Sequence, residues 1–157
     1  MLSIDYDSIF SDFLGNFTDY DFAQQDITNA NLQMGEWLHK ALAKPHLRRL
    51  FSSVVLNDEI QVITVELVHM TDKDDGSKDK DFVCDVIAKG MVVEWLRPQV
   101  NTHEVIRQFF GGNEQKFYSQ ANHLSELRAL YKDAKEEFEA MIRDRGAIHN
   151  SYLEDET

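Results

Sequence analysis

The side chains best suited to metal chemistry lie at a helical spacing early in the chain. Glu36 and His39 form the Glu-x-x-His step with which helical di-iron proteins bind metal. Such sites need a second copy of the step and two further glutamates that point into the same bundle. We predict that Glu36 and His39 match this spacing by chance and bind no metal.

A run of aspartates within residues 71–81 suggests a calcium loop, but its spacing does not fit one. Three aspartates precede Gly76, as acids precede the glycine of an EF-hand. Counted from Asp72, however, the glycine position holds Ser77 and the twelfth position holds valine instead of glutamate. The chain also has one cysteine and no His-Glu-x-x-His motif, so no motif supports a zinc site. We therefore expect neither a metal nor a cofactor.

Nucleophilic catalysis has one thiol candidate, Cys84. It lies in an apolar run, where a cysteine is more often a small buried hydrophobe than a thiolate. Gly111 and Gly112 are not followed by the Gly-Lys-Ser/Thr of a phosphate-binding loop, and no Gly-x-Ser-x-Gly elbow occurs. The other histidines are scattered in polar contexts, at His46, His69, His103, His123 and His149. We expect no catalytic residue, which favours a binding or structural role over an enzyme.

Length and charge narrow the class of protein further. The 157 residues correspond to one domain, and 16 basic against 28 acidic residues give a net charge of −12. That charge is unfavourable for a sequence-reading DNA binder or for binding an anionic membrane, because both rely on Lys and Arg. The single cysteine excludes an internal disulfide, and no basic leader or long apolar run indicates export or a membrane span. We expect a soluble protein made in the cytoplasm.

Helical periodicity dominates the pattern of apolar residues. Residues 26–44 repeat apolar side chains every three or four positions, and Pro45 then begins a fresh turn. Residues 82–96 are apolar nearly all round, which predicts a buried helix that ends at Pro98. Within it, Gly90 is expected to allow a neighbouring helix to approach closely.

The C-terminal third predicts two more helices. A capping box at residues 101–104 opens a short helix that two glycines end. Residues 119–146 carry the strongest periodic signal, a heptad seam. The seam consists of Leu124, Leu127, Tyr131, Ala134, Phe138 and Met141. We expect it to face the core, while Lys132, Glu136 and Glu137 face water or a partner.

One stretch has a different character. Residues 60–68 are dense in alternating β-branched side chains, which favours a strand, although a short apolar run also fits a buried helix. Residues 71–81 lack any apolar side chain and predict an exposed polar loop. The fold class that follows is mostly α: a helical bundle with a long C-terminal helix and one small β element.

The chain divides into an N-terminal arm at residues 1–20, a helical domain at residues 21–149 and a C-terminal tail at residues 150–157. The arm is rich in aromatics and aspartates, and it packs either on a neighbouring chain or on its own core. We expect both ends to be open to protease in the free chain and to become ordered on docking. Removal of the arm is expected to leave the helical domain folded.

Four segments in the second half of the chain carry a family resemblance. They are Gly90-Met-Val-Val-Glu-Trp-Leu-Arg-Pro-Gln-Val100, Phe110-Gly-Gly-Asn-Glu-Gln-Lys-Phe-Tyr-Ser-Gln-Ala-Asn-His-Leu-Ser-Glu-Leu-Arg128, Arg143-Asp-Arg-Gly146 and Asn150-Ser-Tyr-Leu153. Together they resemble the head–tail connectors, or neck adaptors, of tailed phages. The likeness covers residues 82–153. Ala147 departs from the aromatic residue expected after that glycine, and the resemblance does not extend to residues 1–60.

The resemblance implies a structural virion protein that forms a ring of about twelve copies below the portal protein. Its implied partners are its own copies, the portal, and other neck or tail proteins, with no membrane. DNA would pass through the channel without specific binding, and an acidic lining suits this because it repels phosphate. The family offers no catalytic residues. The implied location is the virion, after synthesis in the host cytoplasm.

The main alternative belongs to another class, an acidic inhibitor that mimics the charge of DNA and occupies a nucleic-acid enzyme. It predicts paired rows of carboxylates, whereas a connector needs apolar anchors and complementary charged patches. The aromatic arm favours the connector, and the first 39 residues hold seven acids and no Lys or Arg before a short basic stretch. The candidate interface residues are Phe10, Phe13, Phe17, Tyr20, Lys40, Lys44, Arg48, Arg49, Tyr152 and Leu153.

Overall fold

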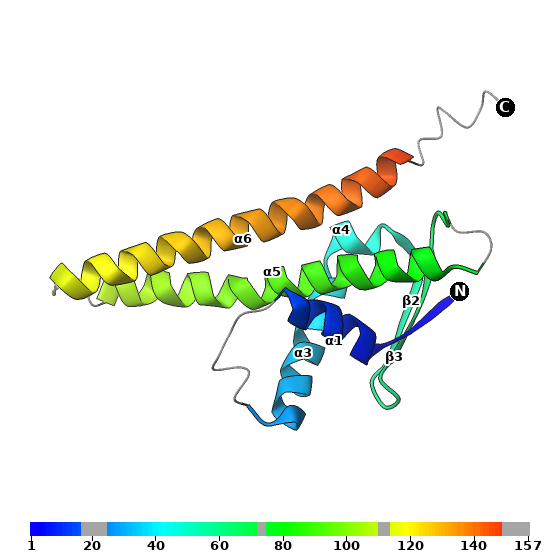
Figure 1. Cartoon of the computed structure of the whole chain (residues 1–157), viewed down its shortest axis with the longest axis horizontal. Coiled ribbons are helices and arrows are strands. Elements are labelled where there is room, and N and C mark those ends of the chain that lie inside the picture. The colour runs from blue at the N-terminus through cyan, green and yellow to red at the C-terminus, as the bar shows by residue number, and fades with distance from the viewer. Residues whose placement is uncertain (17–24, 72–74, 110–113, 149–157) are drawn as a thin grey trace.

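The computed structural model describes residues 1–16, 25–71, 75–109 and 114–148, with the backbone alone described for the helical residues within 102–122 and 146–148. Two long helices, α5 (Ser77–Phe109) and α6 (Glu114–Ile148), lie side by side as a hairpin (Figure 1). The smaller elements pack near the end where α5 begins and α6 ends. They are β1 (Leu2–Asp5), α1 (Tyr6–Gly15), α3 (Ile27–Leu42), α4 (Pro45–Arg48), β2 (Phe51–Asn57) and β3 (Val62–Leu67). The predicted fold class, mostly α with one small β element, is confirmed.

The two long helices and α3 come together at Gly90. A Cβ built on Gly90 would meet Phe138 Cε2 of α6 at 3.0 Å and Ala41 Cβ of α3 at 3.2 Å. At these distances even a methyl group is crowded, since protein interiors are close-packed. The prediction that Gly90 allows a close helix–helix approach is confirmed.

Helix α5 is longer than predicted. It does not end at Pro98 but continues to Phe109, so the two helices predicted around the proline are one. Proline lacks the N–H that would bond to the carbonyl of Glu94, and its ring crowds that carbonyl. In the same turn Gln99 Nε2 donates to the carbonyl oxygen of Trp95 at 3.4 Å. Continued packing against α6 outweighs the local cost of one missing hydrogen bond.

The β element is a three-stranded antiparallel sheet with the order β1-β3-β2. The first strand pairs with β3 such that Leu2 lies opposite Val65, and β2 pairs with the other edge of β3. Ile63, Val65 and Leu67 are buried and alternate with more exposed residues along β3. The strand predicted within residues 60–68 is therefore confirmed, and the helical alternative is wrong.

The N-terminal residues belong to the core, which corrects the arm predicted at residues 1–20. In the part that the structure describes, β1 is an edge strand and α1 packs on α5, with Ile9 and Phe13 fully buried. The junction between β1 and α1 is held by the Tyr6 N–H, which donates to the carbonyl of Gln61 at 2.8 Å. Removal of this segment would uncover a large part of the core, so we now expect it to unfold the chain.

The polar stretch at residues 71–81 is only in part the exposed loop that was predicted. Helix α5 begins at Ser77, whose N–H donates to Asp75 Oδ1 at 2.9 Å. Asp79, in the first turn of the helix, is fully buried. Its burial depends on Arg145, 66 residues further along the chain, which a local polar pattern does not reveal.

Helix α6 confirms the predicted seam. Its buried seam residues are Leu124, Leu127, Ala134 and Phe138, while Tyr131 and Met141 are half-buried against the same core. The opposite face is exposed as predicted, with Lys132 Nζ 3.8 Å from Glu136 Oε1. Glu137 Oε2 lies 2.6 Å from Lys89 Nζ of α5 and ties the two long helices at their surface.

Candidate functional site

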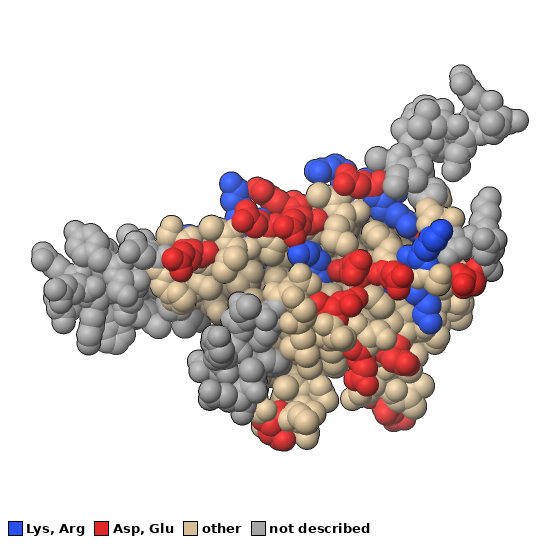
Figure 2. All heavy atoms as spheres, in the orientation of Figure 1, with Lys and Arg blue, Asp and Glu red and all other residues tan. Residues whose placement is uncertain are grey.

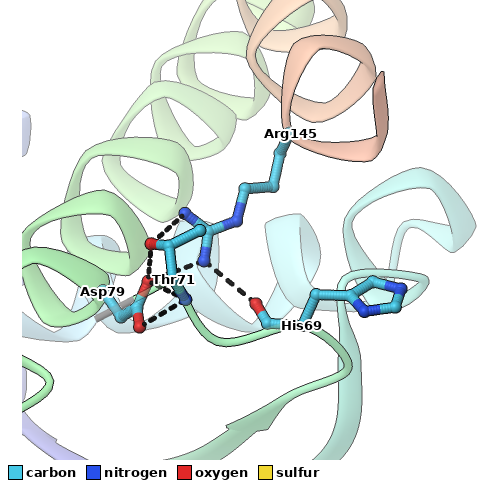
Figure 3. Close-up of polar contacts among 4 residues, drawn as sticks. All are labelled: His69, Thr71, Asp79 and Arg145. Atoms are coloured by element: carbon cyan, nitrogen blue, oxygen red, sulfur yellow. Dashed lines mark hydrogen bonds and ion pairs between the residues drawn. The ribbon is translucent and has the colours of Figure 1, made fainter. Parts of the chain in front are cut away.

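A buried ion pair joins the first turn of α5 to the last turn of α6 (Figure 3). Arg145 Nη2 donates to Asp79 Oδ1 at 2.6 Å and to the carbonyl oxygen of His69 at 3.0 Å. Thr71 completes the cluster, because its N–H and its hydroxyl donate to the Asp79 carboxylate at 3.0 Å and 2.6 Å. The helices α5 and α6 and the segment after β3 thus share one polar network.

Most polar atoms of this network are paired, and Arg145 Nε is the buried side-chain nitrogen of the described residues that has no hydrogen-bond partner. Asp79 is fully buried, and the Arg145 side chain is 11% exposed, with its guanidinium carbon 4.5 Å from the centroid of the Phe82 ring. A carboxylate removed from water is stable only when it is paired and hydrogen-bonded. We interpret the cluster as support for the surface beside it.

A pocket of about 640 Å³ opens beside this ion pair. Its walls come from α4 and the residues after it, the end of β3, and the last turns of α6. The apolar part of the lining consists of Leu50, Leu67, Val68 and Ile142. Volume and lining fit a small ligand or a short peptide segment.

The polar part of the pocket is basic, in a chain whose net charge is −12. Arg49, Arg143, His46 and His69 line it, and Glu139 is the one acid among its described lining residues. Arg49 Nη2 lies 2.8 Å from His46 Nδ1, and the Arg143 side chain is exposed. In Figure 2 Lys and Arg gather at this end of the molecule and along α6. The arrangement suits an anionic group that carries an apolar portion.

The basic residues predicted as an interface do not form one patch. Arg49 lines the pocket, whereas Lys40 lines a different cleft, between α1 and α3. Lys44 is directed to α5, with Nζ 3.5 Å from Oε1 of the buried Glu94. Arg48 is exposed on α4, outside the pocket lining.

The aromatic interface candidates that the structure describes are core residues, which corrects their assignment. Phe10 is 4% exposed and Phe13 is fully buried, so neither is open to a partner. Phe13 packs against Trp37 of α3 with ring centroids 5.4 Å apart. The remaining candidates lie outside the described residues: Phe17, Tyr20, Tyr152 and Leu153.

A second polar cluster lies in a cleft of about 480 Å³ between α1, α3 and the β2–β3 turn. Tyr6 Oη donates to Asp58 Oδ1 at 2.6 Å, and His39 Nε2 lies 2.9 Å from the same oxygen. The hydrogen bond from Tyr6 lowers the pKa of Asp58, and the hydrogen bond from His39 has the same effect to a smaller extent. Burial of the Tyr6 side chain raises the pKa of its hydroxyl, and the hydrogen bond to Asp58 raises it further. A tyrosine that stays protonated is a poor nucleophile. We therefore interpret the cluster as a structural contact that joins α1, α3 and the β2–β3 turn.

The chain contains two Glu-x-x-His steps, but they do not both lie in helices, as a di-iron site requires. His39 bonds to Asp58, and a second such step, Glu66 to His69, begins in strand β3 instead of in a helix. Among the described residues no group of three His, Cys, Asp or Glu side chains is placed to hold a metal ion.

Cys84 is a buried residue of α5. Burial, assisted by the nearby Asp12, raises the pKa of its thiol to about 11. The thiol is therefore protonated at neutral pH, and only the thiolate is strongly nucleophilic. The residue fits the predicted description of a small hydrophobe.

Comparisons of the chain with protein-family models, with curated proteins and with solved structures found no match. Within the described ranges, no helix combines the length and the apolar character needed to cross a membrane. Any functional conclusion therefore depends on the residues themselves and on how the fold arranges them.

Proposed function

We propose that this protein is a structural subunit of a tailed-phage virion, a head–tail connector that forms a ring of about twelve copies below the portal. The observation that carries the proposal is where the connector-like segments fall. Within the described residues, residues 90–100 lie on α5, and residues 114–128 and 143–146 lie on α6. The resemblance therefore coincides with one structural unit, the α5–α6 hairpin.

The shape of this hairpin supports the proposal. Its two helices have 33 and 35 residues, which corresponds to a rod about 50 Å long at 1.5 Å per residue. In Figure 1 the closed end of the rod extends well beyond α1, α3 and the sheet. Copies arranged in a closed ring contact one another through two different surfaces, and a projecting rod provides both in one element.

The charge distribution supports a channel that does not retain DNA. In Figure 2 the lower part of the visible face, over α1, α3 and the β2–β3 turn, carries acids and no Lys or Arg. Exposed acids of these elements and their flanks include Asp7, Asp26, Asp58 and Glu59, and Lys40 of α3 is their one exposed cation among the described residues. Such a surface repels phosphate and releases no counterions on contact with DNA. We call the surface over α1, α3 and the β2–β3 turn the acidic body, and we propose that it faces the channel.

The charge pattern of α6 favours the connector over a DNA-mimicking inhibitor. A mimic needs rows of carboxylates, whereas the exposed face of α6 mixes both signs. Its exposed charged residues include Arg128, Lys132, Asp133, Lys135, Glu136 and Arg143. The face suits contact between copies better than imitation of a duplex.

Cryo-electron microscopy of phage particles that contain this chain tests the proposal. The expected result is density for the α5–α6 hairpin repeated around the portal axis in the neck. Density in the capsid lattice or in the tail-tube repeat would overturn the connector assignment. Absence from particles, together with inhibition of a DNA-binding enzyme by the purified chain, would support the inhibitor instead.

A pair of charge-reversal variants tests the placement of the acidic body. Asp7→Lys with Glu59→Lys changes the body by +4 charges, and Asp133→Lys with Glu136→Lys makes the same change on α6. We expect the body variant to assemble into particles that release DNA more slowly, because cationic groups bind phosphate. The α6 variant is expected to weaken contact between copies and to lower incorporation into particles, without slowing DNA release from the particles that form. Equal rates of DNA release from particles of the two variants would indicate that a different surface faces the channel.

A further inference from the structure

The pocket beside Asp79 and Arg145 has an apolar surface that no described residue covers. Val68, at the end of β3, is 52% exposed although its neighbour Leu67 is buried. Leu50 and Ile142 extend the same apolar surface toward α4 and α6. Apolar side chains that line a concave site are the usual contacts of a bound group, so this lining can accept one.

We propose that this pocket holds the chain's own residues 149–157, bound back onto the same molecule. The proposal is independent of the function proposed above, and it replaces the expectation that Tyr152 and Leu153 of this tail dock on a neighbouring chain. The order of residues in the segment matches the pocket, since Tyr152 and Leu153 are followed by Glu154, Asp155 and Glu156. Two apolar anchors are thus followed by three negative charges.

Charge complementarity supports this occupant. The lining residues Arg49, Arg143 and Glu139 together carry one net positive charge before either histidine is protonated. Arg143 Nε also lies 3.8 Å from Oδ1 of Asp144, which is exposed and outside the lining, so Arg49 is the main cation of the pocket. The Arg145 guanidinium is neutralised by Asp79 and is excluded from this balance. Guanidinium groups bind carboxylates strongly, through paired hydrogen bonds. The acidic half of the segment therefore has partners at the rim, while Tyr152 and Leu153 pack on the apolar part.

The connection is short enough for the segment to bind within one molecule. Helix α6 ends at Ile148, three residues and about 4.5 Å of helix beyond Arg145. Arg145 itself reaches the carbonyl oxygen of His69, the residue next to Val68. Five residues beyond the helix span up to about 17 Å, which brings Leu153 within reach of the pocket. A short connection also gives a high effective concentration, on the order of millimolar.

Disulfide trapping in the full-length chain tests the proposal. All variants carry Cys84→Ala, and Ser151→Cys places a thiol next to the two anchors without removing either. The pocket partner is Val68→Cys, and the control partner is Val55→Cys, a valine of similar exposure on β2, at 57% against 52%. We expect the pair with position 68 to form a disulfide at least about tenfold faster than the control pair. The product is expected to be a monomer at every protein concentration.

A second pair of variants tests the charges. Arg49→Glu is expected to slow disulfide formation several-fold, whereas Arg48→Glu, on α4 but outside the pocket, is expected to leave it unchanged. Added salt should slow the reaction as well, because it screens charges at the surface. Circular dichroism confirms that each variant is folded. If Val68→Cys unfolds the chain, His46→Cys on the α4 wall replaces it.

Three results would overturn the proposal. Equal rates at positions 68 and 55 would show that the segment does not prefer the pocket. A disulfide that forms between molecules, at a rate that rises with protein concentration, would place the segment on a second copy. Equal effects of Arg48→Glu and Arg49→Glu would remove the electrostatic basis for the choice of occupant.

Discussion

Arg145 and Asp79 are 66 residues apart in the chain and 2.6 Å apart in the fold, where Arg145 Nη2 donates to Asp79 Oδ1. The bond connects the last turn of α6 to the first turn of α5. It therefore closes the open end of the hairpin, opposite the connection at residues 110–113. Through His69 and Thr71 the same network fixes the segment that follows β3. One wall of the basic pocket is held in place by this pair.

Loss of one partner of this pair is expected to destabilise the fold strongly. Arg145→Met leaves the fully buried Asp79 carboxylate without its cation, and such changes typically cost about 3–5 kcal/mol. Urea unfolding of the variant and the parent measures the difference in the free energy of unfolding. Arg143→Met, two positions earlier and exposed, is the matched control and should change stability by less than about 0.5 kcal/mol.

A double variant shows whether the loss of stability comes from losing the ion pair or from leaving one charge buried without its partner. Asp79→Leu with Arg145→Met removes both charges, and replacement of a buried ion pair by apolar residues is often neutral. We expect it to be more stable than Arg145→Met alone. A cost below about 1 kcal/mol for Arg145→Met would contradict the burial of Asp79.

Close packing at Gly90 gives a second prediction. Gly90→Ala places a methyl group 3.0 Å from the Phe138 ring and 3.2 Å from Ala41 Cβ. Overpacking of this kind costs about 1–3 kcal/mol, against the roughly 1 kcal/mol that alanine gains over glycine in a helix. Because the added methyl group meets two helices at once, we expect the overpacking cost to be the larger of the two. We therefore expect a lower free energy of unfolding, measured by urea titration.

Gly35 is the control for this change. It lies inside α3, and a Cβ built there has nothing within 4 Å. Gly35→Ala should therefore raise stability by about 0.5–1 kcal/mol through helix propensity alone. The same sign for both glycines would mean that the three helices do not meet at Gly90.

The parts of the fold that the sequence predicted well are those with a local signal. In α6 each seam residue is identified by neighbours three or four positions away, and Leu127 and Phe138 lie on the buried side as predicted. Alternation over a few residues likewise identified β3. Both patterns reflect one apolar face that must be buried, whatever element covers it.

The errors occur where distant contacts override local preference. Pro98 is a helix breaker by itself, yet α5 continues through it because α6 lies alongside. Asp79 lies in a wholly polar run and is buried by Arg145. The N-terminal aromatics fit a docking arm as well as a core helix, and the packing of α1 on α5 together with the sheet pairing of β1 distinguishes the two.

The candidate site was less predictable than the fold. Of the described residues that line the basic pocket, the sequence pointed to Arg49 as a candidate interface residue, whereas Arg143 appeared only within a connector-like segment. His46 and His69 had no distinguishing context. These side chains meet because α4, β3 and α6 converge, and no spacing within any one of these elements encodes that convergence.

The heptad seam of α6 gives a third prediction. Leu127→Ala removes a buried side chain that is 6% exposed, and such truncations cost about 2–5 kcal/mol. Leu130→Ala, three positions later and 55% exposed, should cost less than about 0.5 kcal/mol. Urea unfolding compares the two. A loss below about 1 kcal/mol for Leu127→Ala would mean that the seam is covered by another copy and not by this chain's own core.

The hydrogen bonds to Asp58 give a prediction about pH. Because Tyr6 and His39 lower the pKa of this carboxyl in the folded chain, its contribution to stability is present above the unfolded pKa of about 3.9. That contribution is lost as the pH falls through the lower folded value. The advantage of the parent over Asp58→Asn should therefore shrink below about pH 4.

An NMR titration of the Asp58 carboxyl carbon measures this effect directly. In the parent chain the pKa is expected below the ordinary value of 3.8. Tyr6→Phe removes the hydroxyl that donates to Oδ1 at 2.6 Å, so the pKa should rise toward that value while the pairing with His39 remains. A parent pKa at or above 3.8, or no change in Tyr6→Phe, would show that the Tyr6 hydroxyl does not bond to the Asp58 carboxylate in solution.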